Sequence, residues 1–153
     1  MKRPEKLAWY GNEFNKIHCN VKNKECLSHY DFLMIRNFKL QNLTTEDGTN
    51  IEKISKEAFK LAKEDKIKES IRRLLELNGV AIPIASTILA MKYPERFAII
   101  DKRVIKALRK NEWLKDYLKS PEIYEKYLLV MRNLAKEKGI SLRKLERGLF
   151  EKE

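Results

Sequence analysis

One stretch decides the fold of this chain: Leu74-Leu75-Glu76-Leu77-Asn78-Gly79-Val80-Ala81-Ile82-Pro83-Ile84-Ala85-Ser86-Thr87-Ile88-Leu89. It predicts an apolar helix, a tight turn, and a second apolar helix. Gly79 permits the left-handed backbone that ends the first helix. Pro83 suits the first turn of the second helix, where its missing N–H group costs nothing. Val80, between them, can fold back into the core, so the stretch forms a hairpin of two packed helices.

A second stretch, Phe97-Ala98-Ile99-Ile100-Asp101-Lys102-Arg103-Val104, places one acidic residue at the beginning of a basic helix. Asp is a favoured N-cap residue, because its carboxylate accepts a hydrogen bond from a free amide of the first turn. A carboxylate can also stabilise the positive charge that develops on a sugar when an N-glycosidic bond breaks, and can orient or deprotonate water. Asp101 is therefore both a candidate cap and a candidate catalytic residue.

The pattern Leu-x-Gly-Val-x-x-x-x-Ala-x-x-Ile-Leu begins at Leu77, and Pro-x-x-Phe-x-x-x-Asp follows it and ends at Asp101. Together they resemble the central motif of the helix-hairpin-helix base-excision DNA glycosylase superfamily, the endonuclease III-like proteins. The specific part covers about residues 66–110, and the tail from Tyr124 to Phe150 is similar to a small prokaryotic branch. The resemblance implies a hairpin that binds DNA phosphates through backbone N–H groups, followed by a catalytic Asp101.

Three departures from that pattern limit the chemistry that the resemblance implies. Ala81 stands where a second glycine is usual, which keeps the backbone further from a phosphate. Pro83 stands where bifunctional members carry a lysine nucleophile, which excludes lyase chemistry through that position. The cysteine cluster that holds an iron–sulfur centre in some relatives is absent from the C-terminal half. The expected activity is therefore monofunctional base excision without a cofactor.

Composition favours one compact domain made of helices. The chain has 153 residues, of which 43% are hydrophobic, with only 5 Gly and 4 Pro. We expect N-terminal helices over 1–45 to pack on a hairpin core over 46–153. No apolar run approaches the roughly 20 residues that span a bilayer, and the basic N-terminus lacks the apolar segment of a secretory signal. The expected location is cytoplasmic, with no membrane partner.

The charge balance points to a polyanionic partner. The sequence has 33 basic and 22 acidic residues, a net charge of +11. Such a field favours nucleic acid first and an anionic membrane surface second, although a Lys-rich composition also occurs in proteins from hot environments. Contacts to duplex DNA are expected from the backbone of Gly79, Val80 and Ala81 and from the side chains of Lys92, Arg96, Lys102, Arg103 and Lys106.

Apolar positions recur at helical spacing and no segment alternates strictly, so the predicted fold class is all-α. Local signals set the expected boundaries. We expect helices over 4–18, 26–40, 51–64 (capped by Asn50), 66–77 (capped by Asp65) and 102–110 (capped by Asp101), and a short amphipathic turn or helix over 113–118. We also expect a second hairpin helix ending near Tyr93-Pro94, helices opened by Ser120-Pro121 and by Ser141, a stop at Gly139, and a loop over 41–50.

Two further sets of side chains are of types that could carry chemistry. His18, Cys19, Cys26 and His29 are four candidate zinc ligands, but their spacing matches no standard finger and the first two are adjacent, so no metal site is expected. An extruded base needs a pocket with aromatic walls. The candidates for those walls are Trp9, Tyr10, Tyr30, Phe32, Trp113 and Tyr117.

These observations lead to three hypotheses. The first is a DNA-binding glycosylase-like protein in which Asp101 activates water for base excision. The second is a non-catalytic DNA-binding or adaptor module that keeps the same scaffold. The third is a protein-interaction domain whose basic surface meets acidic partners, which competition by duplex DNA would distinguish from the first two.

Overall fold

The computed structural model describes residues 3–39 and 48–152, without the side chains of residues 3–10 and 48–49. These ranges contain helices and no strand, which confirms the all-α prediction. The elements are α1 (Arg3–Val21), α2 (His29–Lys39), α3 (Gly48–Lys63), α4 (Ile67–Leu74), α5 (Ile82–Lys92), α6 (Lys102–Ala107), the 3-10 helix η1 (Asn111–Trp113), α7 (Pro121–Lys138) and α8 (Leu142–Lys152).

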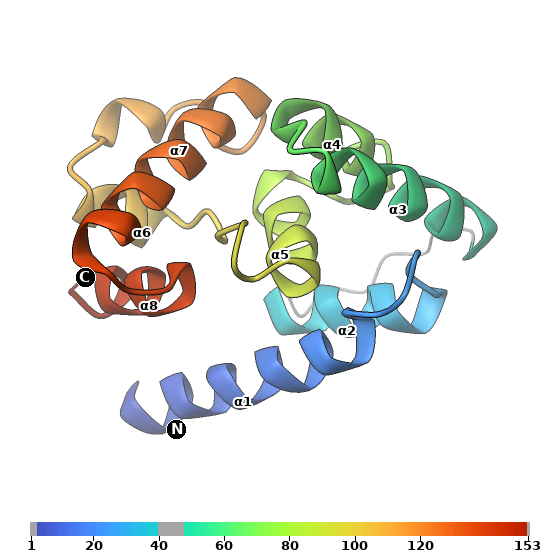
Figure 1. The fold of residues 1–153 in the computed structure, drawn as a ribbon, viewed down its shortest axis with the longest axis horizontal. Coiled ribbons are helices and arrows are strands. Elements are labelled where there is room, and N and C mark those ends of the chain that lie inside the picture. The colour runs from blue at the N-terminus through green and yellow to red at the C-terminus, as the bar shows by residue number, and fades with distance from the viewer. Residues whose placement is uncertain (1–2, 40–47, 153) are drawn as a thin grey trace.

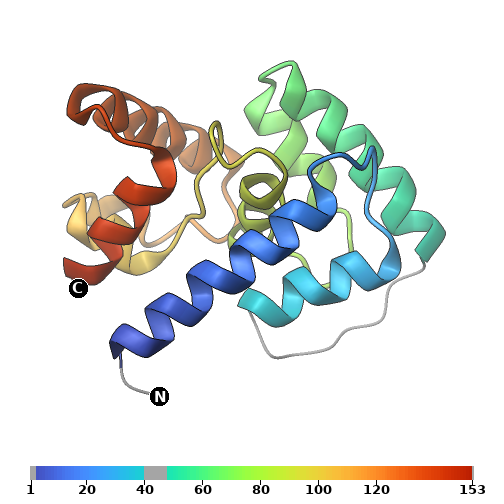
Figure 2. The same ribbon diagram turned by 60° about the horizontal axis from the view of Figure 1, so that its bottom comes forward.

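Helix α5 lies at the centre of the fold (Figure 1). It packs against α1, α2, α3 and α4, and every residue of it except Pro83 is buried. A helix that is apolar on all sides requires such a position, because each face must meet another element. Helices α6, α7 and α8 form a second group beside it, as the turned view also shows (Figure 2). The contact of α4 with α7 joins the two groups.

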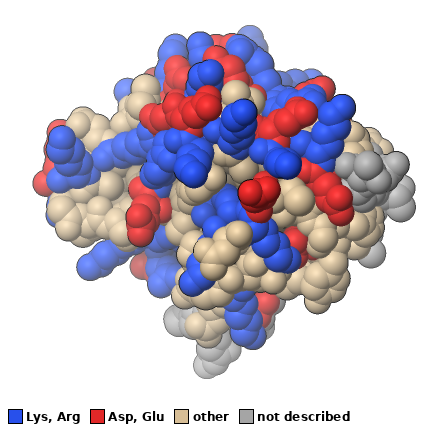
Figure 3. Space-filling view, turned by 45° about the vertical axis from the view of Figure 1, so that its right-hand side comes forward, with Lys and Arg blue, Asp and Glu red and all other residues tan. Residues whose placement is uncertain are grey.

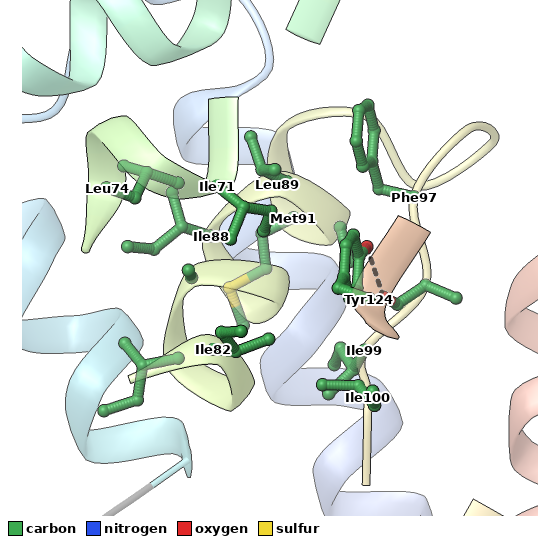
Figure 4. Packing of buried hydrophobic residues seen from close by; sticks show 14 of the residues in the cluster. Ile71, Leu74, Ile82, Ile88, Leu89, Met91, Phe97, Ile99, Ile100 and Tyr124 are labelled. Carbon is green, nitrogen blue, oxygen red and sulfur yellow. Dashed lines mark hydrogen bonds between the residues drawn. The ribbon is translucent and has the colours of Figure 1, made fainter. Parts of the chain in front are cut away.

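The core runs from the hairpin into the segment that precedes Asp101 (Figure 4). Ile71 and Leu74 of α4 meet Ile88 and Met91 of α5, and all four side chains are fully buried. Phe97, Ile99, Ile100 and Tyr124 continue the same cluster. Truncation of one such aliphatic side chain to Ala costs about 2–5 kcal/mol, because it leaves a cavity. The hairpin therefore packs on a fully buried apolar cluster.

The predicted ends of α7 and the predicted beginning of α8 hold in the structure. The Ser120 side chain accepts a hydrogen bond from the Ile123 amide at 3.2 Å and begins α7. Gly139 ends α7 in the left-handed conformation, with φ of 65°. The Ser141 hydroxyl accepts from the Lys144 amide at 3.1 Å at the beginning of α8.

Two capping predictions were wrong. Helix α3 begins at Gly48, so Asn50 lies inside it rather than in front of it. The residue before α4 is Lys66, which makes no side-chain cap bond. Asp65 instead adopts a left-handed backbone with φ of 59°, and its carboxylate accepts hydrogen bonds from Arg96 and Arg132. The guanidinium groups, which come from distant parts of the chain, attract this carboxylate away from the helix end.

Other boundaries differ by a few residues. Helix α2 is shorter than expected at its beginning, and the first hairpin helix ends at Leu74, after which turns lead to Val80. The segment over 113–118, expected as a short turn or helix, consists of the end of the 3-10 helix η1 and the turns that follow it. Within the expected loop over 41–50, residues 41–47 lie outside the described residues, as does the expected boundary at residue 45. The last three belong to α3.

Candidate nucleic-acid interface and catalytic carboxylate

The hairpin turn has the backbone that its sequence predicts. Gly79 is exposed and has φ of 74°, a conformation that an L-residue with a Cβ adopts only at a cost. Val80 is 9% exposed and folds into the core. Ala81 is the exposed N-cap residue of α5 and has no side-chain cap bond, and Pro83 lies in the first turn. The positive end of the α5 dipole therefore begins at an exposed turn.

Some of the polar groups of this turn are already used inside the protein. The Val80 amide donates to the Leu77 carbonyl at 3.2 Å, and the Ile82 amide donates to the Leu118 carbonyl, also at 3.2 Å. The Gly79 carbonyl accepts from Nη1 of Arg36 at 2.7 Å. In the described parts of the chain, the amides of Gly79 and Ala81 have no acceptor. These two amides, rather than the whole turn, are the donors that remain for an anion.

Asp101 lies at the beginning of α6 and caps it as predicted. Its Oδ1 accepts a hydrogen bond from the Arg103 amide at 2.7 Å. Its Oδ2 lies 3.4 Å from Nζ of Lys39, the last residue of α2. The side chains are 26% exposed for Asp101 and 21% for Lys39, so this ion pair is open to solvent on one side.

The extended segment before Asp101 is fixed by hydrogen bonds from three helices. The Ile99 amide donates to Oε1 of Glu146 at 2.7 Å, and the Ile100 amide donates to the Ser86 hydroxyl at 3.0 Å. The hydroxyls of Tyr124 and Tyr127 donate to the carbonyls of Ala98 and Ile99, at 2.8 and 2.7 Å. Buried main-chain groups need such partners. The side chains of α5, α7 and α8 thereby hold the backbone that carries Asp101.

The electrostatics around Asp101 involve several titratable side chains. Burial raises the pKa of Glu146, while the guanidinium of Arg143 opposes that rise. The pKa of Tyr117 is raised by its burial and also by the negative charge of Asp101. Tyr117 is one of the residues proposed for an aromatic wall, and its side chain is half-buried.

The other proposed wall residues do not form one cluster with Tyr117. Trp9 and Tyr10 have side chains outside the described residues. Phe32 is fully buried in the core, and Tyr30 is 69% exposed on α2. Trp113 is buried and packs edge-on against Tyr127.

The expected phosphate contacts differ in accessibility. Lys92 is 8% exposed, and its Nζ donates to the carbonyls of Val21, Lys22 and Lys24 at the end of α1. Burial lowers the pKa of Lys92. An ammonium held by three carbonyls inside the fold cannot reach a phosphate. Lys92 is therefore not proposed as a phosphate contact.

The remaining basic candidates lie at the surface. Arg96 donates to the carbonyls of Ala62 and Lys63 at the end of α3, and Arg103 lies over the Phe150 ring at 4.9 Å. Lys102 and Lys106 are exposed on α6, next to Asp101. On the face drawn in Figure 3, Lys and Arg side chains are numerous but Asp and Glu lie among them. Lys102, Arg103 and Lys106 thus remain exposed cations on α6.

Of the four histidine and cysteine candidates, His18 has a partner within the protein. Nδ1 of His18 lies 2.6 Å from the Met91 carbonyl and joins α1 to the end of α5. Cys19 is exposed and Cys26 half-buried, and both are free thiols. In the described ranges, no three His, Cys, Asp or Glu side chains gather as metal ligands would. No helix in those ranges has both the length and the apolar character needed to cross a bilayer.

Sequence reasoning missed two residues of this site. Lys39 and Glu146 approach the region of Asp101 from α2 and α8, which are far away in the sequence. No local pattern marks either residue, because the approach depends on how the helices pack.

Comparison with known proteins identifies the family of this chain. The family described as "Putative 8-oxoguanine DNA glycosylase OGG-like protein" matches residues 41–150, which is most of the chain and includes the hairpin, Asp101 and α6 to α8. No curated protein and no solved structure matches the chain significantly. The match agrees with the resemblance that the hairpin carries, and the chain belongs to this OGG-like family of DNA glycosylase-like proteins.

Proposed function

We propose that this protein binds duplex DNA through its hairpin and excises a damaged base by hydrolysis, with Asp101 as the activating carboxylate. The observation that carries the proposal is the connection between the two parts of the site. Ser86, on the second hairpin helix, accepts the amide of Ile100, the residue directly before Asp101. A phosphate bound at the hairpin would therefore have a fixed relation to the carboxylate.

Phosphate binding would use backbone donors and nearby lysines. The amides of Gly79 and Ala81 lie at the positive end of α5, where an anion is stabilised without any side chain. Lys102, Arg103 and Lys106 would add contacts on α6. Contacts of this kind position a protein on DNA without reading its sequence, and each neutralised phosphate steepens the dependence of affinity on salt.

Base excision would use the charge of Asp101. Breaking an N-glycosidic bond builds positive charge on the deoxyribose, and a fixed carboxylate close to the sugar stabilises that charge. The same carboxylate can orient or deprotonate the water that attacks C1′. Oδ1 is held by the Arg103 amide, which leaves Oδ2, the oxygen that lies 3.4 Å from Nζ of Lys39.

The family description makes 8-oxoguanine in duplex DNA the first substrate to test. The assay incubates a labelled duplex that carries one 8-oxoguanine with excess protein and then cleaves abasic products with alkali. We expect strand cleavage with the natural protein and none with Asp101→Asn. Asn caps a helix about as well as Asp, so this variant keeps the fold while it loses the charge.

A matched control is Asp116→Asn, which removes an exposed carboxylate after η1 that makes no described ion pair. This variant should excise the base as the natural protein does. The absence of base release by the natural protein from 8-oxoguanine and from a panel of other damaged duplexes would remove the excision claim. An affinity for duplex DNA that does not change with salt concentration would contradict phosphate recognition.

A non-catalytic DNA-binding module is the second candidate, and one observation favours it. Both carboxylate oxygens of Asp101 already have partners, namely the Arg103 amide and the Lys39 ammonium. In that case Asp101→Asn would change neither the DNA affinity nor the fold, and no duplex in the panel would lose a base. Displacement of an acidic protein by duplex DNA would separate both DNA-binding candidates from a protein-interaction domain.

A further inference from the structure

A buried arginine of α2 reaches the hairpin turn from a distant part of the chain. Arg36 lies in the last turn of α2 and is only 3% exposed. Its Nη1 donates a hydrogen bond to the carbonyl of Gly79 at 2.7 Å, and its guanidinium lies over the ring of Phe32, 5.9 Å from the centroid. An arginine is almost never buried without specific partners, and one partner of Arg36 is a main-chain oxygen of the turn itself.

The hairpin alone holds this carbonyl only weakly. Gly79 has φ of 74° and no Cβ, so the peptide that joins it to Val80 can rotate at little cost. Within the hairpin, that peptide is held by the bond from the Val80 amide to the Leu77 carbonyl, which is 3.2 Å long. The bond from Arg36 is shorter and its donor is charged, and charge-assisted bonds are roughly twice as strong as neutral ones. Arg36 is therefore the stronger of these two restraints.

The direction of the Gly79 carbonyl decides which charges the turn presents to an anion. Because the donor is a buried side chain, the oxygen points toward the interior of the protein. In the described parts of the chain, the amides of Gly79 and Ala81 have no acceptor. A rotated peptide would bring the partial negative charge of the oxygen beside these amides, where it would repel a phosphate.

We infer that Arg36 is a positioning residue of the phosphate site, which keeps the Gly79 carbonyl turned inward so that the turn presents donors to DNA. The inference rests on the DNA binding proposed above and not on base excision. It makes α2 a part of the site, although the residues that match the family, 41–150, begin after this helix.

The first test measures the affinity of each variant for a labelled duplex, at a temperature where circular dichroism shows the variant to be folded. Arg36→Gln removes the charged donor, so binding should weaken about tenfold. Arg36→Lys keeps a charged donor and should recover most of that loss. Lys92→Gln is the matched control, because Lys92 is also a buried cation that donates to main-chain carbonyls, at the other end of α5. This control should lose stability and bind DNA as the natural protein does.

A double-mutant cycle shows whether Arg36 acts through the turn. Gly79→Ala should itself weaken binding, because its Cβ lies beside the amides proposed to bind phosphate. In that background Arg36→Gln should weaken binding no further, since two changes that remove the same interaction are not additive. Additive losses would overturn the inference. So would Arg36→Gln that binds as tightly as the natural protein, or Arg36→Lys that binds as weakly as Arg36→Gln.

A measurement on the natural protein keeps the inference testable if Arg36→Gln does not fold. If the Arg36 bond favours DNA binding, DNA binding must favour the bond to the same extent. Exchange of the Arg36 guanidinium protons with solvent, followed by NMR of protein with isotope-labelled arginine, should therefore slow when duplex is added. The Nε proton of Arg132, which is donated to the Arg96 carbonyl at 2.7 Å, should exchange at an unchanged rate. Unchanged exchange at Arg36 in the DNA complex would overturn the inference.

Failure of the proposed function gives a different result from failure of this inference. A natural protein that does not bind duplex DNA would contradict both. Binding that Gly79→Ala weakens and Arg36→Gln leaves intact would contradict only the role of Arg36. Release of 8-oxoguanine, measured separately with alkali, decides only the excision.

Discussion

The hydroxyl of Ser86 accepts a hydrogen bond from the amide of Ile100 at 3.0 Å and donates one to the carbonyl of Pro83 at 2.8 Å. One small side chain thus connects the first turn of α5 with the residue that precedes Asp101. Both Ser86 and Ile100 are fully buried, so no water replaces either bond. Ser86 therefore joins the hairpin and the segment before the carboxylate into one hydrogen-bonded unit.

Ser86→Ala should destabilise this unit. The Ile100 amide would keep its burial and lose its acceptor, which costs about 1–3 kcal/mol of the free energy of unfolding. The freed segment would also carry Asp101 away from its position, so base release should slow by more than the loss of stability explains. Urea unfolding measures the first effect, and single-turnover excision at a temperature where the variant is fully folded measures the second.

Ser70→Ala is the matched control for that substitution. Ser70 is also a fully buried serine, but among the described residues its hydroxyl bonds only to the Ile67 carbonyl within α4 and accepts no amide from another segment. Its removal should cost less and should leave excision unchanged. Equal effects of the two substitutions would contradict the role assigned to Ser86.

Glu146→Gln should change how stability depends on pH. Burial raises the pKa of Glu146 in the folded protein above its unfolded value of about 4.3. The folded state then prefers the protonated carboxyl, so the natural protein loses stability as the pH rises from the unfolded pKa through the folded one. Gln stays neutral and its amide oxygen can still accept from Ile99, so the variant should escape that loss.

The measurement is the free energy of unfolding between pH 4 and pH 8. The difference between Glu146→Gln and the natural protein should grow in favour of the variant as the pH rises, by about 1.4 kcal/mol for each unit by which the fold raises the pKa. Glu95→Gln, at an exposed glutamate with no described partner, should follow the natural protein at every pH. If the difference in free energy of unfolding between Glu146→Gln and the natural protein shrank as the pH rose, the raised pKa of Glu146 would be contradicted.

Features that depend on neighbouring residues in the chain were predictable from the sequence. Gly79 turns the chain because only its missing Cβ tolerates φ of 74° cheaply. Asp101 and Ser120 cap helices because a short polar side chain reaches an amide two or three residues further on. These signals were sufficient for the hairpin, the all-α class and the position of the candidate carboxylate.

Features that depend on packing between distant segments were not predictable. Asp65 has the residue type of a cap but lies within reach of Arg96 and Arg132, and charge-assisted bonds to two guanidinium groups are stronger than one bond to an amide. The sequence predicts that Lys92 is a surface cation, but its Nζ donates to the Lys22 carbonyl at the end of α1 from within the fold. The approach of Lys39 to Asp101 likewise follows from the placement of α2.

An exposed lysine of α6 and the buried Lys92 should differ in their effect on DNA binding. Lys106→Gln removes an exposed cation of α6, so it should weaken duplex binding for every sequence and reduce the salt slope by about 1. Lys92→Gln removes a buried cation and should lower stability while the salt slope stays the same. Titrations of a labelled duplex at four salt concentrations measure both slopes. If folded Lys92→Gln showed a reduced salt slope, Lys92 would contact DNA after all.

Gly79→Ala tests whether the hairpin turn itself meets DNA. A Cβ at φ of 74° strains the backbone by about 1–2 kcal/mol, and it also lies beside the amides proposed to bind phosphate. Gly139→Ala introduces a similar strain, at φ of 65°, in open space at the end of α7. Both variants should therefore lose a similar amount of stability in urea unfolding. Only Gly79→Ala should lose affinity for duplex DNA, by tenfold or more, because only its turn has to approach a phosphate closely. If both variants bind DNA equally well, the phosphate lies elsewhere on the protein and the hairpin is only a packing unit.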